Sequence, residues 1–411
     1  MISFEEQANA ARGQYKITDI KAMTISHVDT VYPVGQQQGR ARTRHTFIKV
    51  ETDAGLSGYG PCGGSGRAAR DVIAMLKSGY GRHMNLSPIG KDPLAIEVHF
   101  HNLFRAVPQR GNQVRILSGI DIALWDLAGK ILNQPVSKLL GGNFRDEIPL
   151  YSHCPDAPAE RYLDKGWWHD TAQELLEDPR GFRAFKVDIH HALGTIIQQV
   201  VPSIGPEEAR KVQRMYALAR EAFGPDVDII VHCHDELDVP SAIRVAKAVA
   251  PIDPLYYEDP LDVPFSEAWM MLRRATDLPI MTGENLALPD QVLPFLQNGA
   301  IDVLQPDLVN VGGITGGKKV ADLCALFRIP ITLHNVSSWA LNMASQQFAA
   351  AIFDCPMMEC LRYADRVAEA ASNAPVIRNG KQKVSTLPGL GLDFNQEYLK
   401  AHLEEGEPWW G

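Results

Sequence analysis

Pro254-Leu-Tyr-Tyr-Glu258 is the first of five short apolar runs that each end in an acidic residue or a histidine. The four runs that follow end in Glu284, Asp307, His334 and Glu359. Successive members of this series are separated by 26, 23, 27 and 25 residues. One strand and one helix with two loops occupy such a length in a parallel βα barrel, which has roughly 250 residues in eight units. The spacing therefore predicts an α/β fold that contains a (β/α)8 barrel.

The positions of these polar residues also indicate a function. All strands of a parallel barrel end at one face, and catalytic groups gather at that face. Each of the five residues stands at the C-terminal end of its apolar run. The series therefore predicts an active site at the C-terminal ends of the barrel strands.

The composition restricts the class of protein. The chain has 411 residues, of which 45% are hydrophobic and 22% charged, so it can bury a large core and form two domains. A net charge of −9, a pI of about 5.8 and the lack of a Lys/Arg cluster argue against nucleic acid as a partner. The first residues do not resemble a signal peptide, and no stretch approaches the roughly 18 apolar residues of a membrane helix. We expect a cytoplasmic protein without a membrane partner.

The cysteines point to a reducing environment. They contain no Cys-x-x-Cys pair and lie mostly within apolar runs. We interpret them as reduced thiols in the core. They are Cys62, Cys154, Cys233, Cys324, Cys355 and Cys360.

The order of the predicted elements divides the chain into three parts. Two β-rich stretches, 20–34 and 45–52, precede helical patterns, an order that is typical of an α+β domain. We assign residues 1–142 to this N-terminal domain and residues 143–370 to the barrel. Residues 371–411 form a C-terminal segment that we expect to pack back on the first domain.

Within the barrel part, strand patterns alternate with helical patterns. Strands are predicted near residues 148–152, 183–188, 228–233, 255–258, 279–283, 302–306, 330–333 and 356–359. The segment 189–210 is longer than a simple loop, and insertions between a strand and the next helix usually carry substrate contacts.

Three other segments are interpreted as loops. The polar segment 35–43 and the glycine-rich segment Gly58–Gly66 have the composition of loops. No βαβ unit with a ribose-binding acid follows the glycine-rich segment, so it is not a dinucleotide-binding motif. Gly312–Lys318 has the spacing of a phosphate-binding loop, but Lys319 stands where Ser or Thr must bind Mg²⁺. We expect a turn there that caps the following helix.

Several motifs resemble the enolase superfamily. They are the five spaced residues, the predicted helix Gly119-Ile-Asp-Ile-Ala-Leu-Trp-Asp-Leu-Ala-Gly-Lys130, Leu139-Leu-Gly-Gly142 and Asn310-Val-Gly-Gly-Ile-Thr315. The chain is similar to the mandelate racemase/muconate lactonizing group over nearly its whole length, and especially to its acid-sugar dehydratases. The resemblance implies a modified TIM-type barrel with an N-terminal capping domain. It also implies abstraction of a proton α to a carboxylate, with Mg²⁺ stabilising the enediolate.

The resemblance also implies a set of metal ligands. Glu258 and Glu284 match the second and third ligands of the family, and carboxylate oxygens suit a hard dication. The first ligand is normally Asp, but His232 stands at that position, 26 residues before Glu258. Because imidazole binds Mg²⁺ poorly and Mn²⁺, Fe²⁺ or Zn²⁺ well, either the metal differs or its binding is weaker. The alternative is that His232 is a hydrogen-bonded histidine in a metal-free protein.

By the same resemblance, three residues match catalytic groups. His234 matches a histidine that acts in acid/base catalysis in galactonate and mannonate dehydratases. His334 and Asp307 match the His–Asp pair of the family, in which the carboxylate fixes the tautomer of the imidazole and raises its basicity.

Three further residues bear on the type of reaction. Lys186 fits the first lysine of a Lys-x-Lys motif, whereas Asp188 replaces the second, which racemases of this group use as a base. This replacement argues against a Lys/His racemase, and a further hypothesis is that Asp188 supplies the charge that His232 lacks. Glu359 matches an acid that contacts the substrate carboxylate, which requires that it be protonated or share a proton.

Together these features predict a hydro-lyase that dehydrates a sugar acid, an aldonate or an aldarate, with the aid of a divalent metal. One histidine would take the α-proton and another would protonate the leaving hydroxyl. An epimerase, a racemase or a cycloisomerase is the alternative among enzymes, and a catalytically silent relative that binds a small acid is the alternative outside them. The partner is a small carboxylate, and a homo-oligomer is compatible with the sequence.

Overall fold

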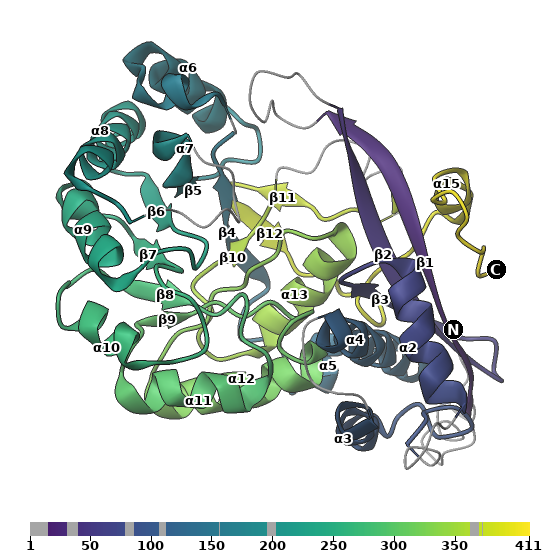
Figure 1. Cartoon of the computed structure of the whole chain (residues 1–411). Helices are drawn as coiled ribbons and strands as arrows, with labels where there is room; N and C mark the ends of the chain where they lie inside the picture. The colour runs from purple at the N-terminus through teal and green to yellow at the C-terminus, as the bar shows by residue number, and fades with distance from the viewer. Residues whose placement is uncertain are drawn as a thin grey trace.

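The computed structural model describes residues 15–30, 40–78, 86–106, 112–155, 157–194, 203–361, 370–371 and 373–411. Its N-terminal part begins with a three-stranded antiparallel sheet of β1 (Ile17–Thr30), β2 (Arg40–Thr52) and β3 (Ser57–Cys62), in this order. The helices of this part are α2 (Gly66–Ser78), α3 (Ile96–Ala106), α4 (Asn112–Leu132) and α5 (Val136–Leu139). Figure 1 shows this sheet and its helices beside the barrel.

Two of the segments predicted as loops are largely regular structure. Ser57–Cys62 of the glycine-rich segment is strand β3, and the stretch after Gly312 is the start of helix α12 (Gly313–Phe327). A Cβ atom on Gly58 would lie 2.0 Å from the carbonyl oxygen of Ala123 in α4. Glycine therefore permits α4 to pack directly on β3, and the prediction of a loop at residues 58–62 was wrong because composition does not distinguish the two uses of glycine. Residues 35–39 of the third predicted loop lie outside the described residues, and residues 40–43 belong to β2.

The barrel follows, and it confirms the predicted fold. Its strands are β4 (Glu147–His153), β5 (Ala184–Asp188), β6 (Asp228–His232), β7 (Tyr256–Glu258), β8 (Ile280–Thr282), β9 (Val303–Leu304) and β10 (Met358–Glu359). Each pairs in parallel with the next from β4 to β9, and β10 pairs with β4. The predicted strand at 330–333 forms parallel bridges, from Ile331 to β9 and from Leu333 to β10, rather than a continuous strand. These bridges close the barrel.

Helices surround the strands (Figure 1). They are α6 (Lys165–Leu176), α7 (His190–Leu193), α8 (Pro206–Phe223), α9 (Val239–Val249), α10 (Glu267–Arg273), α11 (Leu288–Asn298), α12 and α13 (Trp339–Ala351). Helix α9 illustrates why they form. Asp238 caps its N-terminus by accepting from the amide of Ser241, and Ala242, Val245 and Val249 form a buried face at helical spacing.

The C-terminal segment contacts both parts of the molecule. Its strand β12 (Lys381–Lys383) pairs with β11 (Ile377–Arg378) and, antiparallel, with β4 of the barrel. After helix α15 (Gln396–Ala401), the amide of Ser26 in β1 donates to the carbonyl of His402 over 2.8 Å.

Two further predictions can be compared with the structure: that the cysteines are core thiols and that no segment crosses a membrane. All six cysteines lie in described segments, where they are buried and form no disulfide with one another, as expected of core thiols. Over the same segments, no helix has both the length and the apolar character that crossing a membrane requires.

The packing of α4 on β3 leads to a prediction. We expect Gly58→Ala to lower the free energy of unfolding by about 2 kcal/mol or more, because the new methyl group overlaps the backbone of α4. Urea unfolding followed by circular dichroism measures this change. Gly166→Ala is a matched control, since Gly166 is an exposed residue within α6 where alanine is the better helix former. Equal stability of the two variants would contradict the packing argument.

Candidate active site

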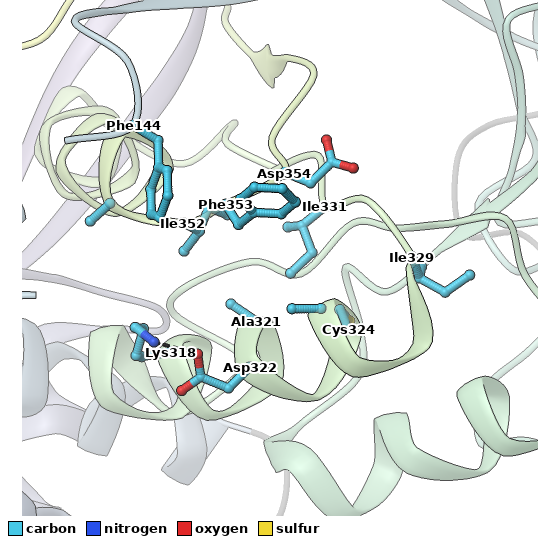
Figure 2. A pocket seen from close by; sticks show the side chains of 12 residues that line it. Phe144, Lys318, Ala321, Asp322, Cys324, Ile329, Ile331, Ile352, Phe353 and Asp354 are labelled. Atoms are coloured by element: carbon cyan, nitrogen blue, oxygen red, sulfur yellow. Dashed lines mark hydrogen bonds and ion pairs between the residues drawn. The ribbon is translucent and has the colours of Figure 1, made fainter. Parts of the chain in front are cut away.

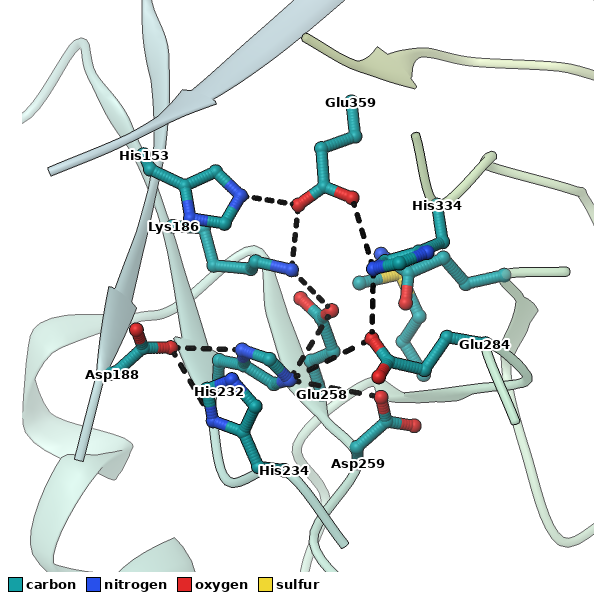
Figure 3. Close-up of polar contacts among 12 residues, drawn as sticks. His153, Lys186, Asp188, His232, His234, Glu258, Asp259, Glu284, His334 and Glu359 are labelled. Atoms are coloured by element: carbon teal, nitrogen blue, oxygen red, sulfur yellow. Dashed lines mark hydrogen bonds and ion pairs between the residues drawn. The ribbon is translucent and has the colours of Figure 1, made fainter. Parts of the chain in front are cut away.

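The predicted site residues converge at the C-terminal ends of the barrel strands. Figure 3 shows side chains from successive strand ends directed toward one another. The structure joins all of the residues that the sequence predicted into one cluster of polar contacts, in part through Asp188. They are Lys186, His232, His234, Glu258, Glu284, Asp307, His334 and Glu359.

One part of this cluster can hold a metal ion. His232, Glu258, Asp259 and Glu284 each offer a ligand atom, and these atoms all lie within 4.8 Å of one another. Nε2 of His232 is 3.7 Å from Glu258 Oε1, 3.7 Å from Asp259 Oδ2 and 3.9 Å from Glu284 Oε2. Each of the four side chains has a buried oxygen or nitrogen without a hydrogen-bond partner among the described residues. Since buried polar atoms are normally satisfied, these residues fit a divalent cation.

Sequence reasoning missed Asp259 in this group. In a regular strand, neighbouring residues point to opposite faces, so Asp259 should point away from Glu258. Asp259 has φ 45°, however, and this left-handed backbone ends β7 and directs both side chains to the site. Its Oδ1 accepts from the hydroxyl of Thr282 over 2.6 Å. Burial and the charge of Glu284 raise the pKa of Asp259 to about 6.

His232 is also linked to Asp188. Its Nδ1 lies 2.8 Å from Asp188 Oδ1, which accepts this hydrogen bond. Burial alone would lower the pKa of His232, but Glu258 and Asp188 help to raise it well above its usual value. Asp188 and His232 are therefore in direct contact, while the hypothesis that Asp188 supplies the charge that His232 lacks stays a prediction.

Lys186 lies between two buried carboxylates. Its Nζ is 2.9 Å from Glu258 Oε1 and 2.6 Å from Glu359 Oε1. Burial lowers the pKa of Lys186, but these two carboxylates outweigh burial and raise the pKa well above its usual value. Its contacts are therefore those of a cation that compensates the two acids, and its predicted catalytic role stays a prediction.

The surroundings of Glu359 favour its ionised form. Its Oε1 accepts from Lys186 and lies 2.5 Å from Nε2 of His153, and its Oε2 accepts from the amide of Asn335. Burial would raise the pKa of Glu359, but Lys186, His334 and His153 lower it well below its usual value. The expectation from the sequence, that Glu359 is protonated or shares a proton when it contacts a substrate carboxylate, stays a prediction. His153 itself was missed, although it ends β4 as the other site residues end their strands.

The predicted His–Asp pair is formed. Nδ1 of His334 lies 2.7 Å from Asp307 Oδ2, while Nε2 lies 3.3 Å from Glu284 Oε2 and 3.8 Å from Glu359 Oε2. Although burial lowers the pKa of His334, Glu284 and Glu359 raise it to about 10. The imidazole is thus oriented by one carboxylate and faces two others.

His234 lies on the other side of the metal-binding group. Its Nδ1 is 3.7 Å from Asp188 Oδ1, and its ring is centred 3.7 Å from that of His232. A φ of 54° at His234 turns the chain sharply after β6. Burial and the neighbouring His232 lower the pKa of His234 well below its usual value, so its imidazole is neutral.

Part of the predicted insertion, 189–210, lies close to Asp188. His190 and His191 of helix α7 each have Nε2 3.9 Å from Asp188 Oδ2. Residues 195–202 of the same insertion lie outside the described residues. The sequence did not distinguish these histidines, because a short helix after a strand has no periodicity of its own.

A separate cavity of about 120 Å³ lies at the opposite end of the barrel. Ile331, which lines it, precedes His334 in its segment, so the cavity is at the N-terminal end of the strands. Figure 2 shows Phe144 and Phe353 across this cavity from Lys318 of helix α12. It shares no residue with the site described above.

Comparison with known proteins agrees with this architecture. Residues 20–141 match the N-terminal domain of mandelate racemase/muconate lactonizing enzymes, and residues 168–398 match the enolase C-terminal domain-like family. The chain belongs to the enolase superfamily. Within it, the two matches identify the mandelate racemase/muconate lactonizing enzyme group and confirm the resemblance seen in the sequence.

Curated relatives in this group match the chain over most of its length. A D-xylonate dehydratase from Haloferax volcanii is 30% identical, over 96% of this chain and 92% of the relative. A D-galactarolactone cycloisomerase from Agrobacterium fabrum is 29% identical, over 93% of this chain and 98% of the relative. Among solved structures, a putative mandelate racemase/muconate lactonizing enzyme from Labrenzia alexandrii superposes with a TM-score of 0.81 at 26% identity, covering 95% of this chain and 96% of that one.

The buried contacts of Lys186 lead to a second prediction. We expect Lys186→Met to lower the free energy of unfolding by about 3 kcal/mol at pH 7, because it leaves buried carboxylates without their cation. The pKa of Glu359 is lowered in the folded protein, so its stabilising pairing is present above the unfolded pKa and is lost as pH falls below about 4. The difference between variant and wild type should therefore shrink in acid.

Urea unfolding at pH 7 and at about pH 3 measures both effects. Lys49→Met is the control, because Lys49 forms its ion pair with Glu51 on the partly exposed face of β2 and should cost at most about 1 kcal/mol. If Lys186→Met were as stable as this control at pH 7, the lysine would not compensate buried charge.

Proposed function

We propose that this protein is a hydro-lyase that dehydrates a sugar acid, an aldonate or an aldarate. The reaction would remove the proton α to the substrate carboxylate and expel the β-hydroxyl as water. The observation that carries this proposal is the arrangement of two imidazoles on different sides of one acidic group. His334 is oriented by Asp307 over 2.7 Å, while Nδ1 of His234 lies 3.7 Å from Asp188, whose carboxylate it shares with His232. A β-elimination needs a base at one position and an acid at another, which two such imidazoles supply.

The relatives support the choice of reaction. Those at about 30% identity include enzymes named D-xylonate, D-gluconate and D-galactonate dehydratases. Their names share a sugar monocarboxylate as substrate and dehydration as reaction. We therefore favour an aldonate for this chain, while the identity of the sugar is left to the experiment below.

The site residues would divide the remaining work. His232, Glu258, Asp259 and Glu284 would hold a divalent cation, which when bound would neutralise the substrate carboxylate and make the α-proton more acidic. Lys186 and His153 hold Glu359 as an anion at the edge of the same group. One of the two imidazoles takes the α-proton, and the other donates a proton to the leaving hydroxyl.

Asp188 argues against a racemase. It stands where racemases of this group have their second catalytic lysine, and its carboxylate is already hydrogen-bonded to His232. The cycloisomerase among the relatives makes ring opening or closure of a lactone the second candidate. That reaction also removes an α-proton, but the ring oxygen leaves in place of the hydroxyl, so the product is an isomer of the lactone and no water is released.

Product analysis tests the proposal. We expect incubation with a library of sugar acids and Mg²⁺ or Mn²⁺ to yield a 2-keto-3-deoxy acid from at least one aldonate. Exchange of the α-proton in D₂O without loss of a hydroxyl would instead indicate an epimerase. A protein that shows neither exchange nor turnover with any acid would be a silent relative, and the proposal would fail.

Variants of the two imidazoles form a third prediction. We expect His334→Asn and His234→Asn each to lower kcat by about 10²-fold or more, because each removes a proton-transfer group. The variant that also loses α-proton exchange in D₂O identifies the base, and the one that retains exchange identifies the acid. His169→Asn is the control, since His169 is exposed on helix α6 and is not among the residues of the cluster. Full activity in either site variant would exclude that histidine from catalysis.

A further inference from the structure

We infer that Asp188 and His232 form a carboxylate–imidazole pair that makes the metal site select a borderline transition metal over Mg²⁺. The metal ions meant are those that accept imidazole readily, such as Mn²⁺, Fe²⁺, Co²⁺ and Zn²⁺. The inference rests on the metal-binding group of the proposed function and names the class of cation that it takes. Asp188 acts through His232 and is therefore a positioning residue.

The backbone holds the pair in register. Asp188 and His232 are the last residues of the adjacent parallel strands β5 and β6, and they are direct partners in the pairing of these strands. Both are buried, with 7% and 2% of their surface exposed. Nδ1 of His232 donates to Asp188 Oδ1 over 2.8 Å. This bond fixes the orientation of the ring, so Nε2 is the atom that faces the acidic group.

Nε2 of His232 is placed as a metal ligand. It has no hydrogen-bond partner among the described residues, although three carboxylate oxygens lie 3.7 to 3.9 Å away. These distances are too long for hydrogen bonds. They are short enough for one ion to contact the nitrogen and the oxygens together. Figure 3 shows His232 between Asp188 on one side and the carboxylates of Glu258, Asp259 and Glu284 on the other.

The donor set determines which metal is preferred. Mg²⁺ favours oxygen ligands, whereas imidazole nitrogen favours first-row transition metals. A carboxylate that accepts from the other ring nitrogen raises the basicity of the ligating one, and removal of such a partner typically weakens metal binding by 10- to 100-fold. Asp188 thus strengthens the preference for transition metals over Mg²⁺ that the imidazole of His232 introduces.

Metal affinities of the full-length protein test the inference. After removal of bound metal with a chelator, titration calorimetry with Co²⁺ and separately with Mg²⁺ gives the two dissociation constants. We expect one site that binds Co²⁺ at least about 100-fold more tightly than Mg²⁺. Asp188→Asn should weaken Co²⁺ binding by about 10- to 100-fold and leave Mg²⁺ binding nearly unchanged. Asp354→Asn, which replaces an acid at the opposite end of the barrel, should change neither constant.

A second variant, His232→Asp, tests the same inference independently of whether Asp188→Asn folds. This variant replaces the imidazole with a carboxylate. We expect it to bind Mg²⁺ more tightly than wild type, and we expect the ratio of the Mg²⁺ to the Co²⁺ dissociation constant to fall by at least about tenfold. The visible absorption spectrum of bound Co²⁺ should change in this variant, because a nitrogen ligand is lost. Tighter binding of Mg²⁺ than of Co²⁺ by wild type, unchanged Co²⁺ affinity in both variants, or no metal bound at all would each overturn the inference.

The outcomes for metal preference and for function are separate. Dehydration of an aldonate by a protein that prefers Mg²⁺ would keep the proposed function and reject the role of Asp188 and His232. The expected metal preference in a protein that dehydrates no acid would keep the metal inference and reject the proposed function.

Discussion

The in-register parallel pairing of β5, β6 and β7 is the constraint on which the site depends. Asp188 pairs with His232, and His232 pairs with Glu258, so the last residues of three consecutive strands lie side by side. Parallel strands that end at the same level direct these side chains toward the same pocket. The hydrogen bond between Asp188 and His232 and the approach of His232 to Glu258 both follow from this alignment.

Buried charge explains the rest of the arrangement. Acids removed from water are costly unless cations or hydrogen bonds compensate them. Lys186 compensates Glu359 directly, and His334 pairs with Asp307. The carboxylates around Nε2 of His232 retain oxygen atoms without hydrogen bonds among the described residues. The site therefore has a localised excess of negative charge, which is where a divalent cation fits.

Two of the motifs that carry the family resemblance, 119–130 and 310–315, hold the capping domain against this site. Asp121 of α4 accepts from the hydroxyl of Thr315 over 2.6 Å and from its amide over 3.0 Å. Arg115 of the same helix donates to Asn310, whose side chain in turn donates to the carbonyl of Glu284. The two motifs thus form one contact between the domains, and this contact reaches the backbone of a predicted metal ligand.

The sequence by itself predicted the barrel and the five polar residues at its strand ends, because apolar runs at a regular spacing with polar ends are a local pattern. Lys186, His232 and His234 were predicted from the resemblance to the family. Only the tertiary structure decided the contributions of Asp259 and His153 and the contact of Asp188 with His232. Asp259 reaches the site through a left-handed backbone that strand periodicity does not predict, and His153 meets Glu359 across the closure of the barrel. Gly58 was mistaken for a loop residue because its role depends on a helix about 65 residues away in the chain. Each difference arises where the conformation of one residue, or a contact between distant segments, outweighs the local pattern.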